Sequence, residues 1–342
     1  MEKNRKTRGR SRRGKQRKPW IAMILAAAIL MIGLVTAAAV IIGFGAEKEI
    51  RTEGEKDRQD ERDSRDEKPV LGGAELTMLK SQSKGQMMSF LLETKEGSLI
   101  VIDGGRWDDG DYLVEQIKKR GGHVSAWLLT HTHTDHVGAL IKILQNEADG
   151  EGAGIQIDNF YYNFAATEWY ALHDQEELGT ADTIIKLLNA QPPEKLHMVG
   201  KGDVITVDDV DITVMNDRYE PDEDHVGDND GNDAGLAYRA VVNDWSILFL
   251  GDLGEVRGQM LLDDVGADGL KSDMVQMAHH GQNGVGEAVY QAVDPSVCLW
   301  PTPQWLWDNE GDRFKTPETK AWVQKLDVKK HYCTKDGDQV IR

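Results

Sequence analysis

The chain has 342 residues, 40% of them hydrophobic, which is enough for the core of one large domain or two small ones. Acidic residues (58) outnumber basic ones (40), and the net charge is −18. Residues 1–18 hold ten Lys or Arg and one Glu, so the rest of the chain carries about −27. A domain this acidic repels extended polyanions, which makes a long nucleic acid an unfavourable partner.

The N-terminal part of the chain does not have the composition of a folded core. Residues 21–45 contain no charged side chain, and about 20 apolar residues are enough for a helix to cross a bilayer. We therefore predict a basic cytoplasmic tail (1–18), a transmembrane anchor (19–46) and a charged linker (47–70), which place the remaining domain (71–342) outside the cytoplasm at the cell membrane. A cleaved signal peptide is the alternative, although its apolar stretch is usually only about 7–15 residues long.

From residue 71 onwards, short apolar runs alternate with polar turns. In the first half, the pattern predicts strands over 74–79, 87–92, 98–102, 124–129 and 160–164, and helices over 112–120, 137–145 and 181–189. In the second half, it predicts strands over 203–207, 210–215, 235–242, 246–250, 274–278 and 297–300 and a last strand from 330, with helices over 255–264 and 317–326. Two similar halves of strands followed by helices indicate an α/β (α+β) fold with two sheets between two helical layers.

The densest group of metal-binding residue types is His131-Thr-His133-Thr-Asp135-His136, directly after the predicted strand 124–129. His131 and His133 project to one side of an extended backbone, and Asp135 and His136 follow on the turn. Such a group can hold two metal ions a few ångström apart, and a water between them becomes a nucleophile near neutral pH. A His-rich surface loop that binds metal by accident is the alternative interpretation.

Further candidates stand at the ends of other predicted strands, where loops can converge on one cleft. Asp252 follows the strand 246–250 and could bridge two metals, although a lone Asp after a strand is usually a turn former. His279 and His280 follow another apolar strand, and such a pair could simply cap a loop. Asp103 is placed to support the metal ligands through hydrogen bonds.

Taken together, these motifs resemble the metallo-β-lactamase-fold hydrolases. The matching elements, in chain order, are Asp103-Gly-Gly, the H-x-H-x-D-H set, Gly251-Asp252 and the late His at 279 or 280. Within that superfamily the chain is most similar to the metallo-β-lactamase-like domain of the DNA-uptake channel protein ComEC, through Ala278-His-His-Gly281, Phe249-Leu-Gly-Asp252 and Gly202-Asp203…Val214-Met-Asn216. The resemblance covers roughly residues 72–342 and implies a four-layer αββα sandwich.

The resemblance also implies a set of ligands for two divalent metal ions. His131 and His133 would bind the first ion, Asp135 and His136 the second, and Asp252 would bridge them. One of His279 and His280 would complete the second site.

The third His that the family uses at the first metal is not evident in this sequence. His173, His197 and His225 are the candidates, and none has the expected local context. The ComEC-like subgroup has an Asn-rich segment at this point, and Asn232-Asp233-Ala-Gly-Leu236 resembles it. An oxygen ligand from Asn232 or Asp233 would make manganese a suitable alternative to zinc, the metal that we expect.

We therefore predict a hydrolase in which a metal-bound hydroxide attacks a phosphoryl or carbonyl centre, with Asp135 and His136 as the catalytic residues. The ComEC resemblance favours a phosphodiester or nucleic-acid-related substrate, and the acidic domain favours a small or local one. The alternatives are a lactonase or β-lactamase-like hydrolase of carbonyl substrates, and a surface-anchored binding module with little catalysis.

The two cysteines, Cys298 and Cys333, lie in short strand-like runs near the C-terminus. In an exported domain they could form a disulfide, and two buried thiols on neighbouring strands are the equal alternative. Their spacing excludes a zinc site built from cysteines.

Overall fold

The computed structural model describes residues 71–219 and 230–342. The predicted basic tail, anchor and linker, and His225, lie outside these residues. In the described part of the chain, no helix has the length and apolar character needed to span a membrane. The anchor and the domain boundaries therefore stay predictions.

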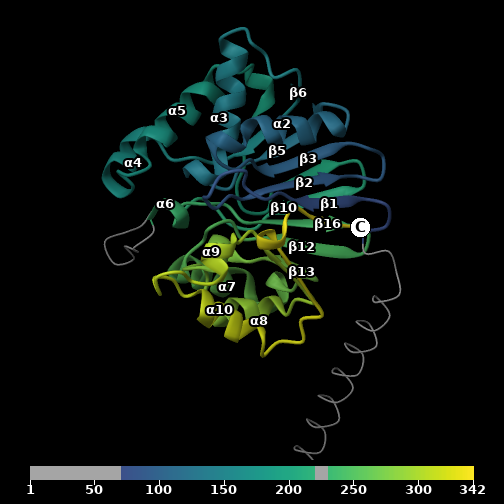
Figure 1. Cartoon of the computed structure of the whole chain (residues 1–342), viewed down its shortest axis with the longest axis vertical. Coiled ribbons are helices and arrows are strands. Elements are labelled where there is room, and N and C mark those ends of the chain that lie inside the picture. Colours follow the sequence, from purple (N-terminus) through teal and green to yellow (C-terminus); the bar gives the residue numbers. More distant parts are fainter. Residues whose placement is uncertain (1–70, 220–229) are drawn as a thin grey trace, which may run out of the picture. The chain divides into compact units, whose positions relative to one another are not determined.

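Two seven-stranded sheets pack face to face, and helices cover the outer face of each (Figure 1). The first sheet has the order β16-β1-β2-β3-β5-β7-β8, with bounds Gln339–Ile341, Glu75–Met78, Ser89–Glu93, Leu99–Asp103, Ala126–Leu128, Phe160–Tyr162 and Leu196–Met198. The second has the order β15-β14-β13-β12-β11-β10-β9, with bounds Lys330–Cys333, Val297–Trp300, Met274–Gln276, Trp245–Phe249, Tyr238–Val242, Val210–Val214 and Val204–Val207. A short pair, β4 (His123–Val124) and β6 (Gln156–Ile157), forms a third sheet.

The helices divide between the two outer faces. On the first sheet lie α2 (Gly110–Lys119), α3 (Thr134–Ala148) and α5 (Leu178–Asn189), and on the second lie α7 (Glu255–Leu270), α8 (Glu287–Val293) and α10 (Thr316–Val323) (Figure 1). The remaining short helices are α4 (Thr167–His173), α6 (Asp230–Asp233) and α9 (Gln304–Trp307), with the single-turn segments η1 (Trp107–Asp109), η2 (Pro193–Lys195), η3 (Ala278–Gly281) and η4 (Thr334–Asp336). The architecture is the predicted four-layer α/β sandwich.

The period of two along each strand explains this layering, because successive side chains of a strand point to opposite faces. In β2, Phe90 and Leu92 enter the core between the sheets, whereas Leu91 packs under the helices. Phe90 meets Phe249 of the other sheet edge to face, with ring centroids 5.1 Å apart. Both faces of the central strands are therefore buried.

The parallel strands of each sheet bring their carboxyl ends to one edge. β3, β5 and β7 run parallel in the first sheet, and β12, β13 and β14 run parallel in the second. The segments after β5, β12 and β13 carry all the predicted metal ligands except Asn232, and Asp103 is the last residue of β3. Ligands bind at such carboxyl ends in α/β folds.

Two differences between the predicted and the observed bounds matter for the site and for the sheet edge. Helix α3 begins at Thr134 and not at residue 137, so Asp135 and His136 lie in the first helical turn and not in the turn before it. The predicted last strand from residue 330 is two strands, since β15 completes the second sheet and β16 crosses back to pair with β1. This return covers the open edge of β1, which would otherwise leave backbone groups unpaired.

Both cysteines are free thiols in buried positions. Cys298 lies opposite His331, and Cys333 lies opposite Trp300, so the two residues are offset along neighbouring strands. Burial raises the pKa of Cys298 to about 12 and that of Cys333 to about 11. The structure therefore has two buried, unreactive thiols, and the disulfide alternative is wrong.

Candidate metal centre

Five of the predicted ligands converge on one buried cluster at the carboxyl ends of the parallel strands. The nearest ligand atoms of His131, His136 and Asp252 lie within 4.8 Å of one another, and so do those of Asp135, His136 and His280. The five side chains come from the segment between β5 and α3, from the first turn of α3, and from the segments that follow β12 and β13. Residues up to 149 positions apart in the sequence thus form one site.

Asp103, the last residue of β3, fixes the orientation of His136. Its fully buried carboxylate accepts hydrogen bonds from His136 Nδ1 (2.7 Å), from Thr130 Oγ1 (2.7 Å) and from Thr130 N (2.8 Å). His136 therefore turns its Nε2 the other way, toward Asp252 Oδ2 at 3.1 Å. The hydrogen bond predicted for Asp103 is present.

His131 and His280 are oriented in the same way. His131 Nδ1 donates to the hydroxyl oxygen of Thr130 (3.0 Å), and His280 Nδ1 donates to the carbonyl oxygen of Pro301 (2.9 Å). Each ring thus turns Nε2 toward the cluster.

Several of these inward-facing atoms have no hydrogen-bond partner within the described residues. They are the Nε2 atoms of His131, His136 and His280 and Oδ1 of Asp252, and all are buried. An unsatisfied buried polar group costs about 1–3 kcal/mol, so native structures seldom keep several together without a ligand. Imidazole nitrogens and carboxylate oxygens are the donors that zinc and similar divalent ions prefer. The residues present therefore fit a metal centre.

The structure separates the roles of the two adjacent histidines of η3. Both have positive φ (49° for His279 and 55° for His280), so the alternation of an extended strand does not apply to them. His280 Nε2 is 3.3 Å from Asp135 Oδ2 and 3.4 Å from Asp252 Oδ2, and its side chain is fully buried. His279 Nε2 is 3.9 Å from Asp252 Oδ2, and its side chain is 13% exposed. His280 is thus part of the cluster, and His279 stands at its edge.

His133 lies beside the cluster and has a partner that the sequence did not indicate. Its Nε2 donates to Asp174 Oδ2 at 2.7 Å, and both side chains are largely buried. This bond leaves Nδ1 as the nitrogen with a free lone pair. The His133 ring lies against that of His131, with centroids 4.6 Å apart, although His133 belongs to neither of the two three-residue groups.

Gly231 of α6 packs directly against this pair. A Cβ at this position would lie 1.8 Å from Asp174 Oδ2 and 2.6 Å from His133 Nε2, so only glycine leaves room for the hydrogen bond. Asp174 follows α4, and α4 and α6 are in contact.

The candidates for the third ligand of the first metal have different positions. His197 Nε2 is 2.8 Å from Asn159 Oδ1, and its ring stacks on Tyr161 of the first sheet, so it does not line the site. His173 lines the cavity beside the cluster, with its ring stacked on Trp169.

Asn232 and Asp233 also differ. Asn232 is buried, lines the same cavity and has an unpartnered Oδ1 within the described residues. Asp233 Oδ1 instead accepts a hydrogen bond from Gly254 N (2.7 Å) at the start of α7. Of the two, Asn232 is the residue with a free oxygen at the site.

The charges of the cluster balance one another in the absence of cations. Burial opposes protonation of His136 and His280, but the carboxylate of Asp252, with Asp103 and Asp135, raises the pKa of His136 well above its ordinary value and that of His280 to about 9. Burial in turn opposes ionisation of Asp252, yet the same two histidines hold its pKa well below the usual range. Metal ions would replace these imidazole protons, because histidine must be neutral to bind a metal.

A cavity of about 430 Å³ opens beside the cluster. Its lining is almost entirely polar and comprises Gln86, Arg106, His133, Thr134, Asp135, His173, Asp174, Glu176, Glu177, Gly231, Asn232 and His279. Asp135 therefore borders both the cluster and the cavity. The cavity is large enough for a small substrate.

Sequence reasoning missed several of these residues. Arg106 follows the Asp103-Gly-Gly motif directly, and this adjacency was the available signal. Asp174, Glu176 and Glu177 belong to a polar segment between two helices, and their spacing from the other motifs gave no indication of a site.

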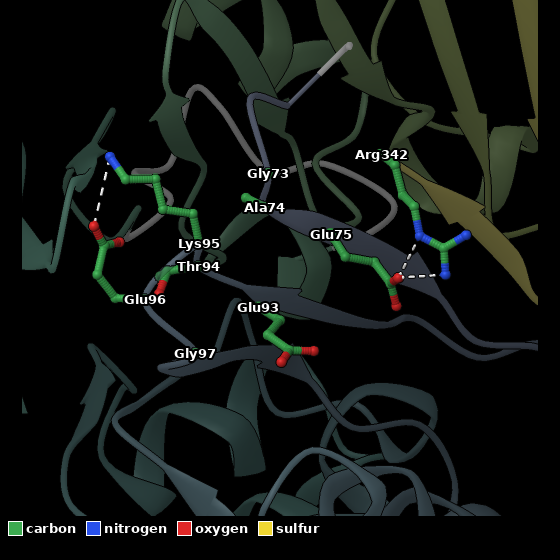
Figure 2. Close-up of a pocket in the computed structure, with 9 residues that line it drawn as sticks. All are labelled: Gly73, Ala74, Glu75, Glu93, Thr94, Lys95, Glu96, Gly97 and Arg342. Atoms are coloured by element: carbon green, nitrogen blue, oxygen red, sulfur yellow. Dashed lines mark hydrogen bonds and ion pairs between the residues drawn. The ribbon is translucent and has the colours of Figure 1, made fainter.

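A second cavity, of about 420 Å³, lies at the start of the domain (Figure 2). Its charged side chains are paired with one another or with close neighbours: Glu75 with Arg342 (2.7 Å), Lys95 with Glu96 (3.5 Å) and Glu93 with Arg120 (3.6 Å). These pairs leave no charge free to bind a ligand, which distinguishes this cavity from the one at the cluster.

Comparison with known proteins agrees with the geometry. Residues 84–285 match the family model of the Metallo-beta-lactamase superfamily. The chain is also similar to the exodeoxyribonuclease WalJ of Streptococcus pneumoniae strains D39 and R6, with 27% identity over 202 residues, which are 58% of this chain and 61% of the relative. The chain thus spans less than two thirds of that relative's length.

Solved structures show a more distant likeness. The metallo-beta-lactamase fold protein YhfI from Bacillus subtilis is 11% identical, with a TM-score of 0.47 over 79% of this chain and 99% of that chain. Yeast PDE1 is 12% identical, with a TM-score of 0.46 over the same shares. At these scores neither supports a statement on activity. The ComEC-type resemblance stays a prediction.

Proposed function

The chain belongs to the metallo-β-lactamase superfamily and is a hydrolase of that superfamily, and we propose that it cleaves phosphodiester bonds with two divalent metal ions. The observation that carries the proposal is the buried set of inward-facing atoms without partners, from His131, His136, His280 and Asp252. With Asp135 they form the core of the proposed site.

We assign the remaining positions of the first metal to His133, through Nδ1, and to Asn232, through Oδ1. Both residues line the cavity beside the cluster. Zinc suits this imidazole-rich set, and the amide oxygen would admit manganese.

Each residue of the site has a distinct task in the proposed reaction. Bound divalent ions would supply an activated water and neutralise charge in the transition state. Asp135 borders both the cluster and the cavity, so it is placed to orient the attacking water toward a substrate. Asp103 and Thr130 hold His136 in one tautomer. His136 and His280 are fully buried, so bulk water does not reach that side of the cluster.

Phosphodiester hydrolysis is favoured over carbonyl hydrolysis by two observations. The curated relatives are exodeoxyribonucleases by name, and the sequence motifs resemble those of the ComEC-type domain. The acidic lining of the cavity favours a small or local phosphodiester over a long duplex. The uncharged stretch of residues 21–45 supports a membrane anchor with the hydrolase outside the cytoplasm.

The test compares bis-p-nitrophenyl phosphate, a lactone and nitrocefin as substrates of the metal-loaded full chain. We expect the phosphodiester to be cleaved best, and Asp135→Asn to lower that rate by about 10²–10³-fold. Asp182→Asn is the matched control, because Asp182 forms an ion pair with Lys186 on a helix surface outside the cavity lining. If Asp135→Asn kept its phosphodiesterase activity with both metals bound, the mechanism would be wrong.

A further inference from the structure

The cavity beside the metal cluster contains one strong cation in an otherwise acidic lining. Arg106 is the only Lys or Arg among the twelve lining residues, whereas Asp135, Asp174, Glu176 and Glu177 supply four carboxylates. The arginine comes from the segment directly after β3. A single guanidinium in this setting is either neutralised by a neighbouring carboxylate or kept free for a ligand.

The position of Arg106 is fixed by its backbone and not by its charge. Its backbone N–H donates to Asp109 Oδ2 at 3.0 Å. The buried carboxylate of Asp109 also accepts from Gln82 N (2.6 Å) and Ser81 Oγ (3.0 Å), so it joins the 81–85 segment to the start of η1. The side chain then lies across Gly85, where a Cβ would come within 2.7 Å of Arg106 Cδ.

The guanidinium itself has no ion-pair partner in the described part of the chain. Two other arginines have partners: the half-buried Arg120 pairs with Glu75 at 3.0 Å, and the buried Arg257 donates to the carbonyl oxygen of Asp217 at 2.5 Å. Arg106 is therefore a pre-positioned cation whose guanidinium pairs with none of the described carboxylates that line the same cavity.

A free guanidinium beside a metal centre suits a phosphate group. Its planar donors match two phosphate oxygens, and it stays charged at every physiological pH. It would also stabilise charge that develops on those oxygens in the transition state. A lactone or β-lactam offers no anionic group at the reacting atom, so the same arginine would do little for a carbonyl substrate.

We infer that Arg106 is the residue that binds the non-bridging phosphate oxygens of the substrate and makes this site selective for phosphodiesters. The inference rests on the proposed function and deepens it. Because the rest of the lining is acidic, the site binds the phosphate under attack and repels phosphates further along a polynucleotide. A compact phosphodiester, or the end of a strand, fits this distribution of charge.

The experiment compares Arg106→Ala and Arg106→Lys with Arg313→Ala in the full chain. Arg313 is exposed and outside the cavity, so its removal takes away an equal charge without touching the site. Readouts are kcat/KM on bis-p-nitrophenyl phosphate and on p-nitrophenyl acetate, binding of inorganic phosphate by calorimetry, and metal content by elemental analysis.

For Arg106→Ala we expect kcat/KM on the phosphodiester to fall about 10²–10³-fold, and phosphate binding to weaken about 10–100-fold. The rate on the acetate ester and the metal content should not change. Arg106→Lys should recover only part of the loss, because lysine lacks the bidentate fork. Arg313→Ala should match the unmodified chain.

Two results would overturn the assignment. One is phosphodiester turnover and phosphate binding that do not change in Arg106→Ala. The other is loss of metal from that variant, which would make Arg106 a support of the metal centre. If the unmodified chain fails to cleave phosphodiesters, the proposed function is wrong, and the phosphate-binding comparison still decides the role of Arg106.

Discussion

The neighbouring histidines of η3 provide the sharpest test of the metal centre, because the structure assigns them different roles. His280 faces Asp135 and Asp252 with a buried, unpartnered Nε2, and His279 faces the cavity. We expect His280→Ala to lose one of two bound ions and His279→Ala to keep both. The two variants change the same residue type at adjacent positions, so each is the control for the other.

The size of the effect follows from the contacts. Removing a group that merely orients a metal ligand weakens metal affinity about 10–100-fold. Loss of His280 as a ligand should therefore cost at least about 100-fold, or about 2.7 kcal/mol. The substitution also leaves Asp135 and Asp252 without the cation between them, which should destabilise the metal-free protein by about 3–5 kcal/mol.

Elemental analysis after purification without chelator gives the stoichiometry, and competition with a chromophoric chelator gives the affinity. Circular dichroism at the same metal concentration shows whether each variant is folded. Two ions bound by His280→Ala with unchanged affinity, together with loss of an ion from His279→Ala, would refute the geometric argument.

Three other predictions follow from neighbouring contacts. Asp174→Ala should weaken one metal site about 10–100-fold, because His133 loses the acceptor that sets its tautomer; an unchanged chelator titration would contradict this. Gly231→Ala should have the same effect in that titration, since its Cβ would meet Asp174 Oδ2 at 1.8 Å. In metal-free protein, the unmodified chain should have a higher free energy of unfolding than His280→Gln, and this difference should be fully present below pH 6.5, the ordinary histidine pKa. It should disappear as pH rises through about 9, the folded pKa, a change of about 3 kcal/mol. If thermal unfolding showed that this difference grows with pH, the prediction would be wrong.

Local patterns in the sequence predicted most of the fold. The alternation in β2 and the apolar strands that precede Asp103 and Asp252 depend only on neighbouring residues, so the order of elements and the layers followed from them. β16 could not be predicted as a separate strand, because three residues at the C-terminus form it only by pairing with β1 at the start of the domain. Likewise, the early start of α3 has no capping signal at His133.

The residue types of the metal centre could be predicted from the sequence, but their arrangement in space could not. The residues of the H-x-H-x-D-H set lie within six positions of one another, so they are close in space whatever the fold of the rest of the chain. The choice between His279 and His280 required the positive φ values of η3, which no strand register can give. Asp174 reaches His133 across 41 positions of sequence, and only the packing of α4 against α6 places it there.

The donors of the metal cluster belong to both halves of the sandwich. His131 and His136 are attached to the first sheet, and Asp252 and His280 are attached to the second. An ion held by all of them would be a cross-link between the two sheets. The binding energy of the ions would then add to the resistance of the fold against unfolding and proteolysis. The metal-loaded protein would thus be more stable than the metal-free one, and the supply of metal would affect its lifetime as well as its activity.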